Sequence, residues 1–160
     1  VTRSSRYWIV EACGRGFGHG KLNELVGAMS NHSLHTIHID DATVVKAPDG
    51  SDVRLLAETR GGGMAQFALD EGAVARAVGH RTIEEMWFVT SGIGRMWRRM
   101  GDEEDIVDLR AGVALTIPTG AHFQFRSDSG GPLTVIAVTL PPWPGAGEAY
   151  PVAGLWEPTV

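Results

Sequence analysis

From residue 35 onward the sequence is built of short apolar or alternating runs, spaced about 8 to 12 residues apart. Gly, Pro and Asp separate these runs, and these residue types end strands and favour tight turns. The expected strands cover residues 36–39, 53–56, 64–69, 85–90, 95–99, 106–109, 113–117, 122–126 and 133–140, with a hairpin turn at 91–94. Regularly spaced short strands predict an all-β sandwich or barrel.

The two ends of the chain differ from this central part. Residues 1–33 contain a series of alternating Gly and no sustained apolar period, so we expect a flexible N-terminal leader, with Met29 as an alternative start. Residues 141–160 are rich in Pro and contain two Trp, and Pro removes the donors that a central strand needs. We therefore expect a single barrel domain over 34–140, and a tail that packs on the barrel or on a partner subunit.

Charge and cysteine content narrow the functional classes. The net charge of -5 argues against a nucleic-acid or anionic-membrane partner, since either would need a basic surface. Cys13 is the single cysteine, which excludes an intrachain disulfide and a zinc-thiolate site. No signal peptide and no apolar run long enough to span a bilayer are apparent, so we expect a cytoplasmic protein.

The first segment with chemical content runs from Gly72 to Gly92. Five residues separate Gly72 from Val78, and His80 comes two positions after Val78. Glu85 follows, and six residues separate it from Gly92. Glycines at these places suit the ends of strands and the turns at a barrel rim. His80 and Glu85 are the side chains named in this segment that could bind a metal or transfer a proton.

The second segment follows about twenty residues later in the chain. Five residues separate Gly112 from Pro118, which is followed by Gly120 and His122. Three residues then separate His122 from Arg126. The turn residues again suit a strand end, and His122 is the second candidate imidazole.

Together these spacings resemble the two motifs of the cupin superfamily over roughly residues 60 to 140. The first cupin motif is Gly, five residues, His-x-His, three or four residues, Glu, six residues and Gly. The second is Gly, five residues, Pro-x-Gly, two residues, His, three residues and Asn. The resemblance implies a conical β-barrel, or double-stranded β-helix of jelly-roll type, made of two antiparallel sheets in one domain. It also implies a homodimer and a divalent metal such as Mn, Fe, Zn or Ni on three His and one Glu.

The sequence departs from those motifs at the metal ligands. Val78 stands where the first ligand His belongs, and valine cannot coordinate a metal. His122 arrives one residue early, with Phe123 in the usual place, and Arg126 replaces the usual Asn. The resemblance therefore implies a reduced metal set of His80, Glu85 and His122.

Gln124 is a further polar candidate near this set. It lies two residues from His122, so both side chains should point to the same side of a regular strand. We expect Gln124 to act as a fourth ligand or as a hydrogen-bonding group for a substrate.

Strand parity leaves the identity of the acidic ligand open. His80 and Glu85 are five residues apart and would lie on opposite faces of an uninterrupted strand, whereas Glu84 would share the face of His80. The family has an irregular stretch at this point, and the count to Gly92 favours Glu85. Glu85 is the expected ligand and catalytic residue, and Glu84 is the alternative.

The parity of Glu85 extends to its neighbours on the same run. Trp87 and Val89 share its face and should line the cavity, where Trp87 would contact a substrate. Met86 and Phe88 should face the other way, into sheet packing.

Three functions fit these residues. The first is a metal-dependent enzyme acting on a small organic molecule, such as a dioxygenase, isomerase or lyase. The second is a metal-free sensor or storage domain that binds a small ligand. A metal-free enzyme is an intermediate case, in which Glu85 is the general base and His80 or His122 is its proton partner. The third is a role in assembly, with the C-terminal tail as a dimer clasp.

Overall fold

The computed structural model of the chain describes residues 34–160, and the predicted leader lies outside them. The described part is nearly all β. Its elements are the 3-10 helix η1 (Ile39–Asp41) and the strands β1 (Val44–Lys46), β2 (Asp52–Glu58), β3 (Gly63–Leu69), β4 (Val78–His80), β5 (Glu84–Ser91), β6 (Ile93–Met100), β7 (Glu103–Arg110), β8 (Ala114–Ile117), β9 (His122–Ser127), β10 (Leu133–Leu140) and β11 (Ala149–Pro151). Within this part no helix has the length and apolar character that a membrane span requires.

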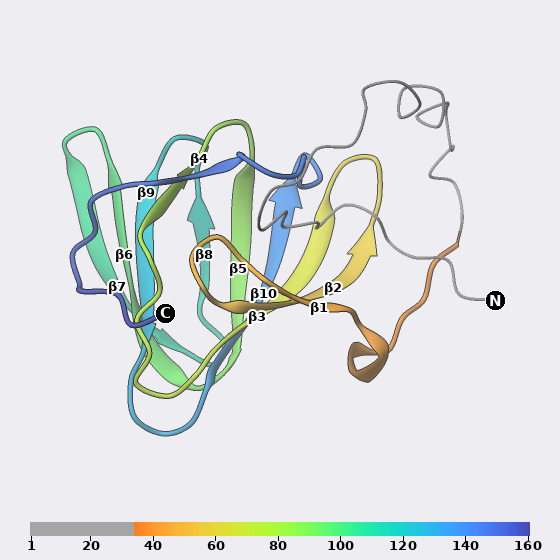
Figure 1. Ribbon diagram of the computed structural model, residues 1–160, viewed down its shortest axis with the longest axis horizontal. Coiled ribbons are helices and arrows are strands. Elements are labelled where there is room, and N and C mark those ends of the chain that lie inside the picture. The colour runs from red at the N-terminus through yellow and green to blue at the C-terminus, as the bar shows by residue number, and fades with distance from the viewer. Residues whose placement is uncertain (1–33) are drawn as a thin grey trace, which may run out of the picture.

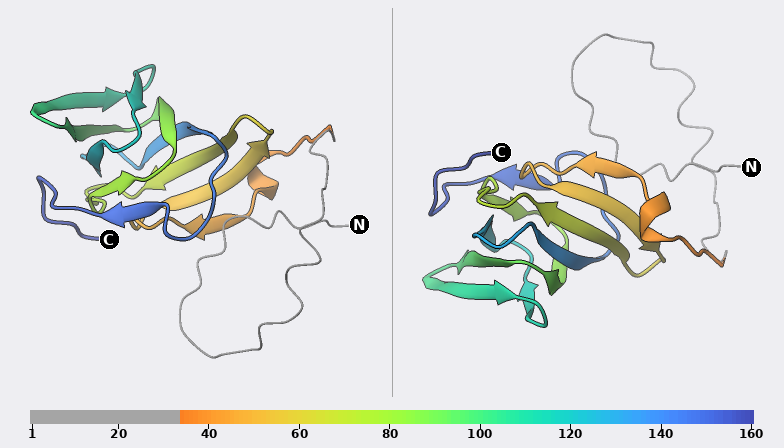
Figure 2. Two further views of the ribbon diagram at one scale, coloured as in Figure 1. Left: turned by 90° about the horizontal axis from the view of Figure 1, so that it is seen from above. Right: turned by 90° about the horizontal axis from the view of Figure 1, so that it is seen from below.

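The strands form two antiparallel sheets that face each other (Figures 1 and 2). One sheet has six strands in the order β1-β2-β3-β10-β5-β8, and the other has five in the order β11-β4-β9-β6-β7. From β4 onward the chain passes back and forth between the two sheets, as in a jelly roll. The predicted all-β barrel of two antiparallel sheets in jelly-roll arrangement is confirmed.

The core lies between the two sheets and follows the alternation of the strands. On β5, Glu85, Trp87 and Val89 are buried, whereas the residues between them are exposed. Trp87 pairs across the ladder with Ala137 of β10, which is also buried. From the opposite sheet Phe125 meets the Trp87 ring edge to face, with 5.0 Å between ring centroids. Such aromatic pairs add to the stability gained from the apolar area that they bury.

The turn between β5 and β6 requires glycine. Gly92 has φ of 82°, and a Cβ there would lie 2.5 Å from the carbonyl oxygen of Pro132 and 2.6 Å from the Cα of Leu133. Both the backbone conformation and the space therefore exclude a side chain. The chain does turn at 91–94, but the predicted hairpin is wrong: β5 and β6 do not pair, and the turn leads from the six-stranded sheet into the five-stranded sheet.

Eight of the expected runs overlap observed strands, and the remaining one is wrong. Residues 36–39 form no strand; they lead into η1, where His38 caps the turn by accepting from the backbone N–H of Asp40. Three strands, β1, β4 and β11, were not predicted. Each is three residues long, too short for alternation to be visible in the sequence.

The C-terminal segment after β10 packs on the five-stranded sheet. In Figure 1 it crosses the upper end of the barrel over β4 and β9 and then runs down beside them. β11 pairs antiparallel with β4, and the Thr159 backbone N–H donates to the Val74 carbonyl at 2.9 Å. The Arg126 guanidinium lies 5.2 Å from the centroid of the Trp156 ring. Of the two expected partners for this tail, the structure shows contacts with the barrel.

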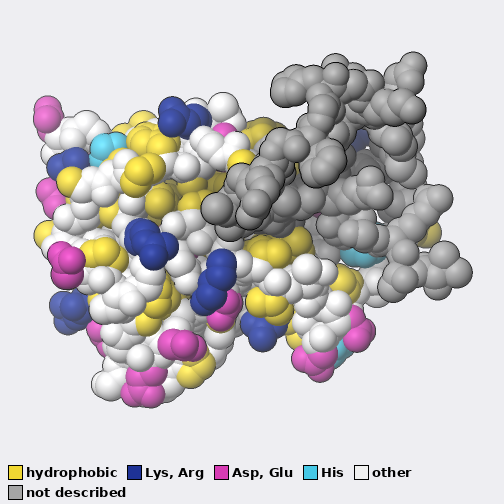
Figure 3. Space-filling view, in the orientation of Figure 1, with side chains coloured by type: hydrophobic (Ala, Val, Ile, Leu, Met, Phe, Trp, Pro, Cys, Tyr) yellow, Lys and Arg dark blue, Asp and Glu magenta, His cyan; other side chains and the backbone are white. Residues whose placement is uncertain are grey.

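The outer face of the six-stranded sheet carries exposed apolar side chains. Met86 and Phe88 on β5 are 48% and 50% exposed, and Met64 on β3, which β10 separates from β5, is 42% exposed. The expectation that Met86 and Phe88 pack against another layer is therefore wrong for this chain alone. On the face shown in Figure 3, the charged side chains of both signs are interspersed. The homodimer stays a prediction.

Candidate functional site

A cavity between the sheets, near the upper end of the barrel, brings together His80 and Glu85. His80 is the last residue of β4 in one sheet, and Glu85 lies at the start of β5 in the other. The chain crosses between the sheets at 81–83, and this crossing allows residues of opposite parity to face the same space. The enclosed space measures about 20 Å³, and the empty volume reaches about 320 Å³ only when the open mouth is included. Its walls are Ala47, Pro48, Asp49, Phe67, Val78, His80, Glu85, Trp87, Phe123, Trp143 and Ala149.

Glu85 is a buried carboxyl, and only 2% of the residue is exposed. The Trp87 indole Nε1 donates a hydrogen bond of 2.7 Å to its Oε2. Burial raises the pKa of Glu85 to about 8, the Asp49 carboxyl acts in the same direction, and the bond from Trp87 opposes both. Glu84, by contrast, is exposed. Of the two carboxyls that the sequence left open, Glu85 is the one that faces the cavity.

His80 is a buried imidazole that lacks a partner for one of its nitrogens. The residue is 4% exposed, and no hydrogen bond reaches its Nδ1 from the described residues. Two aromatic rings meet it edge to face, with centroid distances of 5.1 Å to Phe123 and 5.4 Å to Trp143. Burial lowers the pKa of His80 to about 4, although the Glu148 carboxylate acts in the opposite direction. The imidazole is therefore neutral over most of the physiological range.

Asp49 is a second buried carboxyl in the cavity, which the sequence analysis did not identify. It lies in the loop between β1 and β2 and is 4% exposed. The backbone N–H and the hydroxyl of Ser51 both donate to its Oδ1, at 2.9 and 2.6 Å. Burial raises the pKa of Asp49. The Pro-Asp-Gly sequence at 48–50 predicts a turn, but it carries no spacing signal that would connect the loop to the site.

Glu148, also absent from the predicted site, holds the crossing between His80 and Glu85. Its Oε1 accepts from the backbone N–H groups of Thr82 and Ile83 at 2.6 and 3.0 Å, and its Oε2 accepts from the Thr82 hydroxyl at 2.8 Å. Burial alone would raise the pKa of Glu148, but these hydrogen bonds and the nearby His80 lower it. The C-terminal segment thus fixes the connection that places His80 and Glu85 at one cavity.

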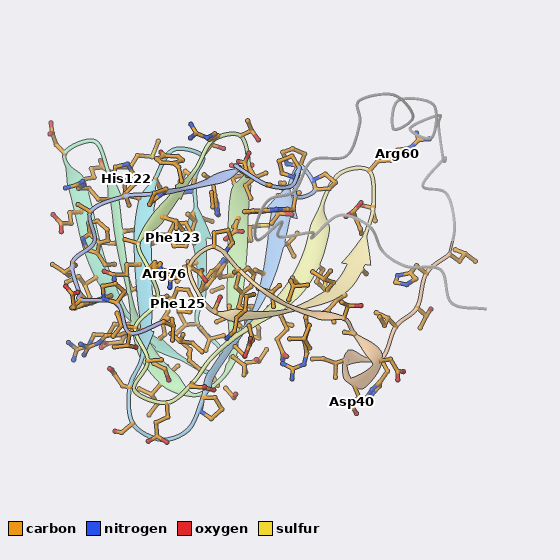
Figure 4. The ribbon with its side chains drawn as sticks, in the orientation of Figure 1. Asp40, Arg60, Arg76, His122, Phe123 and Phe125 are labelled. Atoms are coloured by element: carbon orange, nitrogen blue, oxygen red, sulfur yellow. The ribbon has the colours of Figure 1, made fainter. Side chains whose placement is uncertain are left out.

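His122 does not join His80 and Glu85 at the cavity. Its neighbour Phe123 lines the cavity instead, and Figure 4 shows Phe123 and Phe125 directed into the barrel. The His122 Nδ1 lies 3.3 Å from an Arg99 guanidinium nitrogen, and its ring lies 6.2 Å from that of Tyr150. Because side chains alternate along a strand, the displacement of this His by one residue puts it on the other face of β9.

Gln124 shares the outer face with His122, as the sequence predicted, and it is not part of the cavity wall. The side chain is buried and fully hydrogen-bonded. Its Nε2 donates to the carbonyls of Ala75 and Trp156 at 2.9 and 2.8 Å, and its Oε1 accepts from the backbone N–H groups of Leu155 and Trp156 at 2.9 and 2.8 Å. All four hydrogen-bonding positions of the amide are used, three of them by the C-terminal segment and one by Ala75. None remains for a substrate or a metal.

The described residues do not fit the divalent metal that the family resemblance implies. Nowhere in residues 34–160 do three or more His, Cys, Asp or Glu side chains converge so as to hold a metal ion. Protein metal sites of this kind use at least three side-chain ligands. With Val78 in the wall and His122 on the outer face, the predicted set of His80, Glu85 and His122 is not assembled.

Comparisons of the sequence find no family model that matches and no curated protein that matches. Solved structures, however, share the fold. The Streptomyces nucleoside dehydratase Pac13 aligns with a TM-score of 0.59 and 11% identity, over 75% of this chain and 92% of Pac13. KdgF from Halomonas sp. aligns with a TM-score of 0.56 and 18% identity, over 67% of this chain and 94% of KdgF.

A predicted oxalate decarboxylase from Thermotoga maritima aligns with a TM-score of 0.56 and 14% identity, over 66% of this chain and 98% of that protein. At these identities the likeness concerns the fold. Both the topology and these structures agree with the motif spacing around His80 and Glu85. The chain is a protein of the cupin fold.

Proposed function

We propose that this protein is an acid–base enzyme that acts on a small organic molecule in the cavity, with Glu85 as proton donor and His80 as proton acceptor. The observation that carries the proposal is that both groups lie in one cavity with pKa values shifted in opposite directions, Glu85 to about 8 and His80 to about 4. At pH 7 the carboxyl is protonated and the imidazole is neutral. Pairs of titratable groups separated in this way are typical of general acid–base sites.

The two groups can catalyse an elimination or an isomerisation. In an elimination, His80 removes a proton from carbon, a carbon–carbon double bond forms, and Glu85 donates its proton to the departing hydroxyl, which leaves as water. The imidazolium and the carboxylate are then left in the cavity, and a proton passes from His80 back to Glu85 directly or through that water. In an isomerisation, Glu85 protonates a different atom of the same substrate. Positioned acid–base groups contribute about 10²–10⁴-fold each.

The cavity walls support this chemistry. Trp87, Phe123 and Trp143 surround the polar groups with aromatic surface, which keeps water away from the reacting atoms. The bond from Trp87 to Oε2 also orients Glu85, and Oε1 receives no hydrogen bond from the described residues. Among proteins of this fold, Pac13 is a dehydratase, so the fold accommodates eliminations.

This role for Glu85 reverses the one expected from sequence. The sequence suggested a general base, but a carboxyl with a pKa of about 8 holds its proton at pH 7 and is a donor. The metal-dependent alternative, with Mn, Fe, Zn or Ni, predicts instead that activity needs a bound ion. We expect activity to survive exhaustive dialysis against EDTA; loss of activity that returns with one of these metals would favour the alternative.

The direct test is an NMR titration of the two groups in the intact protein. We expect the Glu85 side-chain carboxyl to titrate near pH 8 and the His80 ring near pH 4. Glu84→Gln and His122→Asn are matched controls, because each removes a group of the same type outside the cavity. A Glu85 carboxyl that is ionised at pH 6, or a His80 ring that is protonated there, would contradict the proposal.

Turnover is tested with a panel of β-hydroxy carbonyl compounds in D₂O. An acid–base site exchanges the carbon-bound proton with solvent even where the elimination is slow, and NMR detects the deuterium. Glu85→Gln and His80→Asn should each abolish product formation, with the same two controls unaffected.

A further inference from the structure

The cavity combines carboxyls, an imidazole and aromatic surface but has no positive side chain. Asp49 and Glu85 are both buried in its wall, and among the described residues no Lys or Arg lines it. A substrate that carries a carboxylate or phosphate would therefore enter an apolar space with two carboxyls and no counter-charge. Transfer of an unpaired anion into such a space is strongly unfavourable.

Two polar positions of these groups receive no hydrogen bond from the described residues. Both bonds from Ser51 end on Oδ1 of Asp49, so Oδ2 receives none from the described residues. The buried Nδ1 of His80 likewise has no partner. A ligand that satisfies the free oxygen of the Asp49 carboxylate must bring an N–H or O–H donor.

Asp49 also lacks a full counter-charge. Burial raises its pKa even though the bonds from Ser51 and the charges of Arg76 and Lys46 act in the opposite direction. Neither of these two cations is part of the cavity wall. The two hydrogen bonds from Ser51 favour the carboxylate form of Asp49, and a positive group inside the cavity would favour it further.

We propose that the cavity binds a small organic ammonium ion, with the ammonium group on the Asp49 carboxylate and the carbon skeleton against the aromatic walls. This inference rests on the proposed function, since it names the substrate class of the same site. Asp49 binds the charged end, which leaves Glu85 and His80 free for the proton transfers. Aromatic rings such as those of Trp143 and Phe123 also attract cations.

An ammonium ion fits this cavity better than a metal ion does. A divalent metal needs three or more ligand atoms that converge on one point, and residues 34–160 contain no such group. An organic cation needs one carboxylate at hydrogen-bonding distance and apolar walls for the rest of the molecule. Asp49 and the aromatic walls supply both.

The experiment uses three probes of nearly equal size, isobutylamine, isobutanol and isobutyrate, at pH 7. Binding to the full chain is measured from chemical-shift changes of the Trp indole N–H signals. We expect isobutylamine to bind at least about tenfold more tightly than isobutanol, with isobutyrate weakest, because a charge-assisted hydrogen bond to a buried carboxylate is among the strong ones. Equal or tighter binding of isobutanol or isobutyrate, or binding of none of the three at 100 mM, would overturn the proposal.

Asp49→Asn identifies the group responsible. The amide keeps the acceptor for Ser51 but cannot carry a negative charge, so the preference for the amine should fall about tenfold or more. Asp70→Asn, an exposed position, is the matched control and should change nothing. An unchanged preference in Asp49→Asn would also refute the role of Asp49. Because binding of these inert probes involves no proton transfer, the NMR titration of Glu85 and His80 can fail or succeed independently.

Discussion

Buried polar side chains on the two sides of strand β9 differ in how many of their hydrogen-bonding positions are satisfied. On the outer face, the Gln124 amide makes four hydrogen bonds and has no unmet position. On the inner side, beyond Phe123, the Nδ1 of His80 has no partner and Glu85 has one, the indole of Trp87. All three side chains are almost fully buried. Buried polar groups are normally satisfied, because an unsatisfied one costs about 1–3 kcal/mol.

This difference in hydrogen bonding distinguishes a structural side chain from side chains that can take part in a reaction. A fully bonded amide such as Gln124 stabilises one arrangement of the chain and has nothing left to offer a ligand. A partly bonded carboxyl and imidazole cost stability and acquire shifted pKa values, which is what a site for proton transfer requires. On this basis, substitutions of the buried groups on the inner side should remove a destabilising term from the free energy of unfolding. Substitutions on the outer side should remove a stabilising one.

Glu85→Gln should have the largest effect and should stabilise the protein at alkaline pH. The folded-state pKa of Glu85, about 8, lies above its ordinary value of 4.5, so its neutral form favours folding below pH 4.5 and stability is lost as the pH rises toward 8. The full difference is on the order of 4 kcal/mol. Urea unfolding at pH 5 and at pH 8.5 measures it: the wild type should weaken between the two, and Glu85→Gln should weaken much less. Glu84→Gln should follow the wild type; if Glu85→Gln does too, Glu85 is not a buried neutral acid.

Gln124→Ala should cause a large loss of stability, about 3 kcal/mol, because it leaves four backbone groups of the C-terminal segment and its neighbours without a partner. The free energy of unfolding in urea provides the measurement. A companion variant, Gln124→Glu, keeps the size but sets a buried carboxyl against two carbonyl oxygens, so it should lose at least as much stability as Gln124→Ala. A loss below about 0.5 kcal/mol for Gln124→Ala would show that the C-terminal segment is not fastened as described.

His80→Asn should flatten the acid side of the stability profile. The folded-state pKa of His80, about 4, lies below its ordinary value of 6.5, so the stability present above pH 6.5 is lost as the pH falls toward 4. About 3 kcal/mol of the wild-type decline between these pH values should disappear in the variant. Thermal unfolding at pH 4.5 and pH 7 makes the comparison. The matched variant His122→Asn should keep the full decline.

His122→Ala should have the smallest effect on the free energy of unfolding, under about 1 kcal/mol, because the ring is half-buried and makes one side-chain hydrogen bond, with Arg99.

A double variant, His122→Phe with Phe123→His, tests the effect of the one-residue displacement. It moves the imidazole to the inner face beside His80 and Glu85, where a divalent metal would have three ligands. Metal content by elemental analysis should rise in the exchanged variant, and no rise would mean that His80 and Glu85 cannot converge on an ion.

The sequence predicted the barrel because its evidence is local and repeated. Gly92 and the alternating run of β5 each indicate a turn or a strand without reference to the rest of the chain, and Glu85, Trp87 and Val89 are all buried as their parity implied. The cupin spacing around His80 and Glu85 placed both residues at one cavity. These parts depend on periodicity, which a single sequence displays.

The rest of the site depends on contacts between distant segments. Asp49 comes from a loop far from the motif, and Glu148 from a segment whose prolines argued against any strand. His122 was placed at the site by its motif, yet a displacement of one residue turned it outward, which only the register of β9 with its neighbours reveals. Neither kind of information can be read from spacing alone.

The hydrogen bonds of Glu148 also bear on how the protein folds. These bonds join residues that are 66 and 65 positions apart in the chain. Two further wall residues of the cavity, Asp49 and Trp143, come from the loop after β1 and the loop after β10. Contacts of such long range form slowly, because the chain must first close large loops. Strands β3 and β10 pair over comparable separations, so the cavity and the barrel should be completed in the same slow step, which the approach of the Trp143 ring to His80 should accompany. Tryptophan fluorescence can follow that event in refolding kinetics.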